Sequence, residues 1–370
     1  MHAHRSPPPT FLATSLLFLL GAGCATGLKL SVIESAQRQP SNLAVFFTVN
    51  TRGGEPVPQL DASQFRIYED GQLVSAAESS QTILNPEVAA EHFTLLLVDM
   101  SGSVRGSGQV PLLVEAASRF TESVGKYQKV AVYAFDGAEE IYPIVPFTGS
   151  AGASARAVSA LNGFPGRDPS TNLHGAIVRA TAVLDQAVNR ARTPLRFGTL
   201  VVFTDGTDRS GRVTFDEMEK ALDDHPHPVY AIGVGGEMDE KTLSRIGRAG
   251  HWLVADQTAI DRAFQTAAER IVGQTRSHYL LSYCSPARAG KHRVTIEAVS
   301  KEPSRSGRVS YDFDAAGFGP GCDPTAAPPF SMKGRTKLRE PREPRAPRGK
   351  PVMATAPNTP AAVNPEQGDY

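Results

Sequence analysis

The sequence predicts an α/β protein whose doubly wound, mainly parallel sheet is inserted in, or flanked by, β-sandwich segments. Three observations support this prediction. Residues 91–275 alternate short apolar runs with helical stripes, which is the pattern of strand–helix units. Two of these runs, Leu95–Val98 and Leu200–Phe203, are continuously apolar, as expected of parallel strands buried on both faces. Residues 25–90 and 276–322 show strands without helix-length periodicity.

Within the α/β region, apolar runs and helical spacing place the elements in order. The expected strands are Phe93–Val98, Lys129–Phe135, Leu200–Thr204, Val229–Gly233 and a short one near Trp252–Val254, with room for an edge strand near Ile141–Phe147. Helical stripes mark residues 110–124, 173–188, 215–222, 243–246 and 259–273. Thr214 and Glu217 form a capping box that opens one of these helices.

Short strands are expected on both sides of this region. The N-terminal ones are Leu28–Ile33, Leu43–Val49, Gln64–Glu69 and Gln72–Ser75, and the C-terminal ones are His278–Cys284, His292–Val299 and Arg308–Phe313. Because neither flank alone offers many strands for a core, we expect both to share one sandwich, with the α/β domain inserted in it. Two small, separate β modules are the alternative.

Three pieces of the chain, far apart in sequence, offer oxygen ligands to one hard cation. Asp99-Met100-Ser101-Gly102-Ser103 follows the first apolar run, Asp205-Gly206 follows the run ending at Thr204, and Thr171 precedes a helical stripe. Alternate residues of extended backbone point to one side, so the side chains of Asp99, Ser101 and Ser103 are expected to converge. Hydroxyl and carboxylate oxygens suit Mg²⁺, Mn²⁺ or Ca²⁺ better than zinc. One such piece is an ordinary turn, but the three together predict a metal site.

This set resembles the metal-ion-dependent adhesion site of von Willebrand factor type A domains, over about residues 92–275. The stretches Thr171-Asn172-Leu173-His174-Gly175-Ala176-Ile177 and Phe203-Thr204-Asp205-Gly206 are similar to the family's pattern. One departure is Asp168-Pro169-Ser170, which stands where a glycine pair often precedes the threonine. The departure concerns the shape of the loop more than the ligand.

The resemblance implies a role for each matching residue. Ser101 and Ser103 would bind the ion directly, and Thr171 would do so in one state. Asp99 and Asp205 would act directly or through water. The sixth position would then take an acidic side chain from a partner.

The first 24 residues resemble a bacterial export signal. A weakly basic start precedes the apolar stretch Phe11–Leu20, which is too short to span a bilayer. Leu20-Gly21-Ala22-Gly23-Cys24 is similar to a lipobox, although Leu stands one place early. We therefore expect lipidation at Cys24 and an outer-membrane lipoprotein facing the periplasm or the cell surface. Ordinary secretory cleavage and release is the alternative.

The remaining cysteines, Cys284 and Cys322, are expected to form a disulfide in an oxidising compartment. Closing a loop of about 39 residues would contribute roughly 3–4 kcal/mol by reducing the entropy of the unfolded chain. From residue 323 onward there are ten prolines in 48 residues, and Lys333–Lys350 carries eight basic and two acidic residues. Residues 323–370 are therefore predicted to be a disordered tail.

Other constellations receive ordinary explanations. Ser101, His174 and Asp205 are not favoured as a hydrolase triad, since the chain has no G-x-S-x-G elbow. His174 is expected to pack at a helix N-terminus or to lie beside the ion's ligands. His225-Pro226-His227, without a third spaced ligand, is predicted to be a solvated turn. Asp136-Gly137 is another carboxylate at a strand end and is predicted to be an ordinary turn.

The sequence therefore predicts a non-enzymatic, adhesion-type protein of the bacterial cell envelope. Through bound Mg²⁺ (or Mn²⁺ or Ca²⁺) it would capture an Asp or Glu of another protein. Lys+Arg and Asp+Glu both number 38, so overall charge implies no attraction to nucleic acid. One alternative is a scaffold that has a vestigial metal site and binds through the β region or the tail. A metal-dependent hydrolase, or the regulatory subunit of one, is the other.

Overall fold

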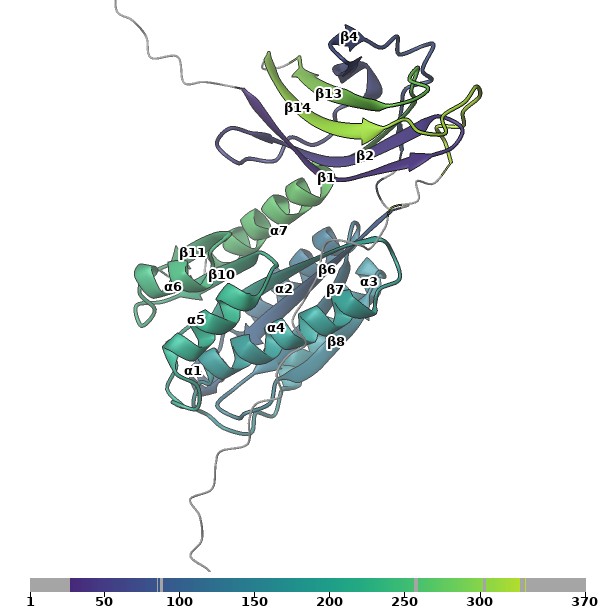
Figure 1. Cartoon of the computed structure of the whole chain (residues 1–370). Helices are drawn as coiled ribbons and strands as arrows, with labels where there is room; N and C mark the ends of the chain where they lie inside the picture. Colours follow the sequence, from purple (N-terminus) through teal and green to yellow (C-terminus); the bar gives the residue numbers. More distant parts are fainter. Residues whose placement is uncertain are drawn as a thin grey trace, which may run out of the picture. The chain divides into compact units, whose positions relative to one another are not determined.

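The computed structural model describes residues 27–330, apart from residues 85, 87–88, 256–258, 302–303 and 327–329 (Figure 1). The predicted export segment, with Cys24, lies outside the described residues, and so does the predicted tail except for residues 323–326 and Phe330. Phe330 is buried. No helix within the described part of the chain combines the length and apolarity needed to cross a membrane.

The central sheet has six strands, and all but one run parallel. The strands are β6 (Ala90–Asp99), β7 (Lys129–Phe135), β8 (Tyr142–Thr148), β9 (Leu195–Thr204), β10 (Val229–Val234) and β11 (Gly250–Val254). Their order is β11-β10-β9-β6-β7-β8, and only β8 pairs antiparallel. Because the chain is wound outward in both directions from β6, the predicted doubly wound, mainly parallel sheet is confirmed.

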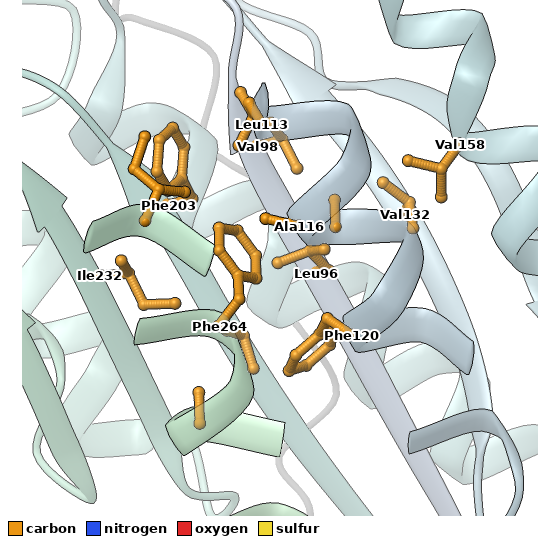
Figure 2. Close-up of a cluster of buried hydrophobic side chains, with 14 of the residues drawn as sticks. Leu96, Val98, Leu113, Ala116, Phe120, Val132, Val158, Phe203, Ile232 and Phe264 are labelled. Atoms are coloured by element: carbon orange, nitrogen blue, oxygen red, sulfur yellow. The ribbon is translucent and has the colours of Figure 1, made fainter. Parts of the chain in front are cut away.

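Helices cover both faces of this sheet. They are α1 (Gly102–Gly106), α2 (Val110–Gly125), α3 (Ala151–Ala157), α4 (Leu173–Arg190), α5 (Phe215–Asp224), α6 (Glu240–Ile246) and α7 (Ile260–Arg276), with a 3₁₀ segment at Val158–Gly163. Helices α2 and α7 pack on one face, and α4, α5 and α6 pack on the other. Figure 2 shows Phe120 of α2 and Phe264 of α7 over the first face, where their rings meet edge to face with centroids 5.9 Å apart.

The predicted helices are present, and several short elements were missed. Thr214 caps α5 as expected, since its side chain accepts a hydrogen bond from the backbone N–H of Glu217. Helix α3 and the 3₁₀ segment after it were not predicted. The sequence of α3, Ala-Gly-Ala-Ser-Ala-Arg-Ala, has no large apolar residues from which a helical stripe could be recognised.

The flanking strands form two antiparallel sheets that face each other across one core. They are β1 (Leu28–Arg38), β2 (Asn42–Thr51), β3 (Phe65–Glu69), β4 (Gln72–Leu73), β5 (Thr82–Leu84), β12 (His278–Cys284), β13 (Lys291–Ser300) and β14 (Arg305–Asp314). The orders are β1-β2-β12-β5 and β14-β13-β3-β4. Each sheet therefore mixes strands from both flanks, for example through the pairs Leu281↔Val45 and Ile296↔Ile67. This pairing is that of a shared sandwich and not of two separate β modules.

A disulfide closes the C-terminal end of the sandwich. Cys284, the last residue of β12, is bonded to Cys322, as predicted. Beside it, the Ser41 hydroxyl donates a hydrogen bond to the carbonyl of Gly321 (2.9 Å), and the Asn42 side chain donates to the carbonyl of Asp323 (2.8 Å). These contacts attach the segment after β14 to the start of β2.

Strand pairing across the two flanks predicts how fragments behave. Residues 92–275 should fold alone and unfold cooperatively, because their sheet and both covering helix layers are contained in that range. Residues 25–90 should not, because β2 and β3 lose the partners β12 and β13. Circular dichroism melts of the two fragments test this, and a cooperative transition in residues 25–90 would contradict the shared sandwich.

Candidate metal site

Two adjacent strands of the central sheet carry the candidate carboxylates. Asp99 is the last residue of β6 and is buried, and Asp205 immediately follows β9 and is partly exposed. The two strands are parallel neighbours, with Val98 opposite Phe203. Both side chains therefore lie at the carboxyl edge of the sheet, between β6 and β9, where the strand order changes direction.

The hydroxyls of Ser101 and Ser103 join these carboxylates in one network. The two serine oxygens are 3.1 Å apart, and the Ser103 hydroxyl donates to Oδ1 of Asp205 at 2.9 Å. Oδ1 of Asp99 accepts from the Ser101 backbone N–H (2.9 Å), and its Oδ2 accepts from the Thr204 hydroxyl (2.8 Å). Four of the five predicted ligands are thus brought together by direct hydrogen bonds.

The local backbone differs from the sequence prediction. Of the three residues expected to alternate, only Asp99 and Ser101 have an extended backbone, because helix α1 already begins at Gly102 and contains Ser103. The Ser103 hydroxyl reaches the site from the first turn of this helix, not from alternation along a strand. Gly102 is required here, because a Cβ would lie 2.8 Å from the carbonyl oxygen of Pro169, which accepts a hydrogen bond from the Gly102 N–H.

Thr171 lies in the loop that precedes α4 and is buried. Its loop is attached to the segment that carries Ser101 and Ser103, because the backbone N–H of Gly102 donates to the carbonyl of Pro169. Its own carbonyl accepts from the backbone N–H groups of Arg209 (2.9 Å) and Ser210 (3.0 Å), in the loop that follows Asp205. Backbone hydrogen bonds therefore link the threonine loop to both other ligand-bearing segments.

Sequence reasoning missed the residue that organises this threonine loop, Asp136. It was predicted to be a simple turn after β7, but it is fully buried. Its Oδ2 accepts from the backbone N–H groups of Arg167 (2.6 Å) and Asp168 (3.2 Å), and its Oδ1 accepts from Ala138 N–H (2.9 Å). Its backbone carbonyl accepts from Asn172 N–H at 3.0 Å, so Asp136 holds the loop on both sides of Thr171. The available signal was a carboxylate at the end of a strand expected beside β6.

Asn172 continues this arrangement into α4. Its side chain accepts from the Gly175 N–H as the N-cap of the helix and donates to the carbonyl of Ala138 at 2.7 Å. Gly137 is required here, because a Cβ would collide with the side chains of Asp168 and Ser170. The segment after β7 therefore acts as a template for the Thr171 loop, which means that its contacts fix the shape that Asp168-Pro169-Ser170 adopts.

His174, the histidine near the site, has structural partners. Nδ1 of His174, in the first turn of α4, lies 3.0 Å from the carbonyl oxygen of Val213, and the ring packs edge to face on Phe215. This agrees with packing at a helix N-terminus and directs the imidazole to the neighbouring loop.

The prediction of a solvated turn at His225-Pro226-His227 is wrong. The His225 side chain is buried, with its Nδ1 3.0 Å from Oδ1 of Asp185 in α4. Burial lowers the pKa of His227 to about 4. Among residues that the structure describes, however, no three His, Cys, Asp or Glu side chains are placed to hold a metal ion.

The two site carboxylates are electrostatically unfavourable without a cation. Burial raises the pKa of Asp99 to about 7, and the nearby Asp205 carboxylate adds to the shift. Burial also raises the pKa of Asp205, although the hydrogen bond from Ser103 opposes it. A divalent cation would offset both negative charges.

The residues present fit such an ion. Neighbouring ligands of an octahedral ion with bonds of roughly 2.0–2.1 Å lie about 2.9 Å apart, close to the 3.1 and 2.9 Å separations among Ser101, Ser103 and Asp205. All donors are oxygens, as Mg²⁺, Mn²⁺ or Ca²⁺ prefer. The serine hydroxyls, Thr171 and Asp205 would hold the ion directly. Asp99, whose two oxygens already accept hydrogen bonds, would act on the ion through a bound water. Because only two of these residues are carboxylates and the other three carry hydroxyls, the site is not one of the groups of three His, Cys, Asp or Glu side chains considered above.

Comparison with known proteins shows which family the central region is similar to. The model of the von Willebrand factor type A domain matches residues 95–272. The central sheet and its helices have the von Willebrand factor type A fold. No curated protein matches the chain.

Several solved structures are similar to the chain at low identity. A von Willebrand factor type A protein from Catenulispora acidiphila is 13% identical, with 77% of this chain and 73% of that chain covered and a TM-score of 0.44. Proximal thread matrix protein 1 from the mussel byssus is 12% identical, with 50% and 49% covered and a TM-score of 0.42. The vWF domain of the type V pili tip protein Mfa5 from Porphyromonas gingivalis is 13% identical, with 50% and 97% covered and a TM-score of 0.39.

The raised pKa of Asp99 predicts how the metal-free type A domain responds to pH. The folded pKa exceeds the ordinary value of 3.8, so the cost of the buried charge is full above about pH 7 and is lost as the pH falls toward 4. Relative to Asp99→Asn, the metal-free wild type should therefore gain stability by about 1–3 kcal/mol as the pH falls across this window. Denaturant unfolding in EDTA at several pH values measures the difference.

The same variant tests the cation. Added Mg²⁺ should raise the melting temperature of the wild type at neutral pH and leave that of Asp99→Asn unchanged. Equal stabilisation of both proteins by Mg²⁺, or a pH response identical in both, would contradict the role given to Asp99.

The position of Asp136 predicts a loss of metal affinity from a residue that does not bind the ion. Asp136→Ala should weaken Mg²⁺ or Mn²⁺ binding by about 10–100-fold, because the Thr171 loop loses its template, and Asp136→Asn should weaken it less. Calorimetric titration of the folded protein measures this. Glu69→Ala is the matched control, since Glu69 is a buried carboxylate hydrogen-bonded to Tyr283 and Ser285 in the sandwich. Equal metal affinity in the two alanine variants would sink the idea.

Proposed function

We propose that this protein captures another protein through a divalent cation bound by Asp99, Ser101, Ser103, Thr171 and Asp205. A carboxylate of the partner would complete the ligand shell of the ion. The observation that carries the proposal is the network of two serine hydroxyls and Asp205 at the carboxyl edge of the sheet. The Ser103 residue is exposed, so this face of the site is accessible to a partner.

The chemistry favours capture of an acid. The site offers only two carboxylates, which balance the charge of a divalent cation without exceeding it. The other donors are neutral hydroxyls, so the ion stays electrophilic. Mg²⁺ takes about six oxygen ligands. Ser101, Ser103, Thr171 and Asp205, together with a water held by Asp99, would leave one position. A partner Asp or Glu brings the negative charge and the oxygen that this position lacks.

We also propose that the protein acts in the bacterial cell envelope, anchored through a lipid on Cys24 and facing the periplasm or the cell surface. The sequence of residues 1–24 supports this location, and the Cys284–Cys322 disulfide agrees with an oxidising compartment. More than one acyl chain would make the anchor stable, where a single chain is marginal. Mass spectrometry of the mature N-terminus distinguishes lipidation from ordinary secretory cleavage.

A hydrolytic role is less well supported by the geometry. The imidazole of His174 contacts the Val213 carbonyl and lies on Phe215, where it is engaged in packing. Ser101 contacts Ser103 and not a base. We therefore propose a binding function and no enzymatic one.

A crosslinked pull-down from envelope extract tests capture. The wild type should retain a partner in Mg²⁺ and lose it in EDTA, and Ser101→Ala should lose it in both, because a direct ligand of the ion is removed. Ser310→Ala is the matched control, since its hydroxyl is exposed on β14 of the sandwich and pairs with Thr295. Amidating the carboxylates of the extract with a carbodiimide should also abolish capture.

Two outcomes would contradict the proposal. Capture that persists in EDTA and in Ser101→Ala would indicate a scaffold that binds through the sandwich or through residues 323–370, with a vestigial metal site. Capture that survives amidation of the extract would show that no partner carboxylate reaches the ion.

A further inference from the structure

Arginines are concentrated on the three segments that carry the candidate ligands. Residues 99–105, 165–172 and 205–212 contain four arginines and no lysine, in a chain whose charges balance overall. We call Arg105, Arg167, Arg209 and Arg212 the arginine rim. Apart from the ligands, the same segments contain two carboxylates, Asp168 and Asp208. The Asp208 side chain is only 4% exposed and accepts the His174 and Gly211 N–H groups, so it faces inward.

Arg105 is held against the serine segment. Its Nε donates to the carbonyl of Met100 at 3.0 Å, between Asp99 and Ser101, and its Nη1 donates to the carbonyl of Pro165 at 3.2 Å. The guanidinium occupies the space that a side chain at Gly166 would need. Because this arginine is already ordered and partly buried, a ligand that contacts it would cost little further side-chain entropy.

Arg212 and Arg209 are held on the loop that follows Asp205. Nε of Arg212 donates to the carbonyl of Gly137 (2.8 Å), and its Nη2 contacts Asp168 at 3.3 Å. Nη2 of Arg209 contacts Glu237 at 2.5 Å, while the Arg209 backbone N–H bonds to the Thr171 carbonyl. These two arginine side chains are 47% and 60% exposed.

Arg167 completes the rim on the threonine loop. Its guanidinium lies over the Tyr142 ring, 5.2 Å from the ring centre, while its backbone N–H is fixed by Asp136. All four arginines are thus held by contacts within or beside the three segments that carry the candidate ligands, Arg105 from helix α1 and the others from loops.

The existing partners of these arginines can be exchanged. Exposed ion pairs such as Arg209–Glu237 and Arg212–Asp168 contribute little to stability, because both charges are solvated. A guanidinium fork binds a carboxylate through two parallel hydrogen bonds, and a carboxylate brought close by a bound ligand can take the place of Glu237 or Asp168. The rim therefore favours ligands that carry more than one negative group.

We infer that the arginine rim selects a short acidic peptide segment, in which one Asp or Glu binds the ion and neighbouring Asp or Glu side chains bind the arginines. This inference rests on the proposed function. A short segment whose side chains radiate in several directions fits arginines placed around one ion. A long polyanion would instead need a continuous basic track, and the chain as a whole carries no net positive charge.

Two fluorescent peptides test the inference, one with a central Asp flanked by Glu residues and one with the same Asp flanked by Gln residues. In Mg²⁺ the wild type should bind the Glu peptide about tenfold more tightly, with a steeper dependence on salt. The double variant Arg209→Gln/Arg212→Gln should lose this preference while still binding both peptides only in Mg²⁺. Arg248→Gln, which removes a similar exposed pair with Asp223 at the opposite edge of the sheet, should keep it.

The outcomes separate the two claims. If neither peptide binds in a Mg²⁺-dependent way, or if Asp99→Asn binds them as the wild type does, the proposed function fails. If Mg²⁺-dependent binding occurs but the wild type and the double variant treat both peptides alike, only the inference about the rim is overturned. Tighter Mg²⁺-dependent binding of polygalacturonate than of the Glu peptide would likewise overturn it, in favour of an acidic polysaccharide.

Discussion

The site depends on two carboxylates that the parallel sheet forces to its carboxyl edge on neighbouring strands. Asp99 is fixed by the end of β6, and Asp205 by the end of β9, in a register set by hydrogen bonds along both strands. Burial and mutual repulsion raise the pKa of Asp99, so the fold holds an electrostatic conflict at this edge. The hydroxyls, the threonine loop and the Asp136 template are arranged around that conflict, and a divalent cation is the simplest group that would resolve it.

Much of this could be predicted from the sequence, because the strong signals are local. Continuous apolar runs mark β6 and β9, and the candidate ligands directly follow them. The longer strands of the sandwich alternate clearly enough to be found, and the even pair of cysteines indicated the disulfide. What the sequence could not provide is the backbone path after Asp99: helix α1 has only five residues, which is too short to produce an apolar stripe.

The remaining misses concern contacts between segments distant in sequence. Asp136 looks like a turn residue, because its partners Arg167 and Asp168 lie about 30 positions away and only the fold brings them near. His225 looked solvated because Asp185 lies on a helix that precedes it by a whole strand–helix unit. The three-residue strand β5 is shorter than any period that can be recognised, and it exists because β12 offers it an edge. In each case tertiary contacts decided what local pattern could not.

The type A domain is inserted between two adjoining strands of the sandwich. The chain leaves the sandwich after β5 and returns through β12, and these two strands are antiparallel neighbours, with Ile83 opposite Leu281. The whole type A domain therefore occupies the place of a hairpin turn between two adjoining strands. A module connected in this way can be exchanged for another of similar end-to-end spacing without altering its host. The sandwich is in this sense a host into which different domains can be inserted.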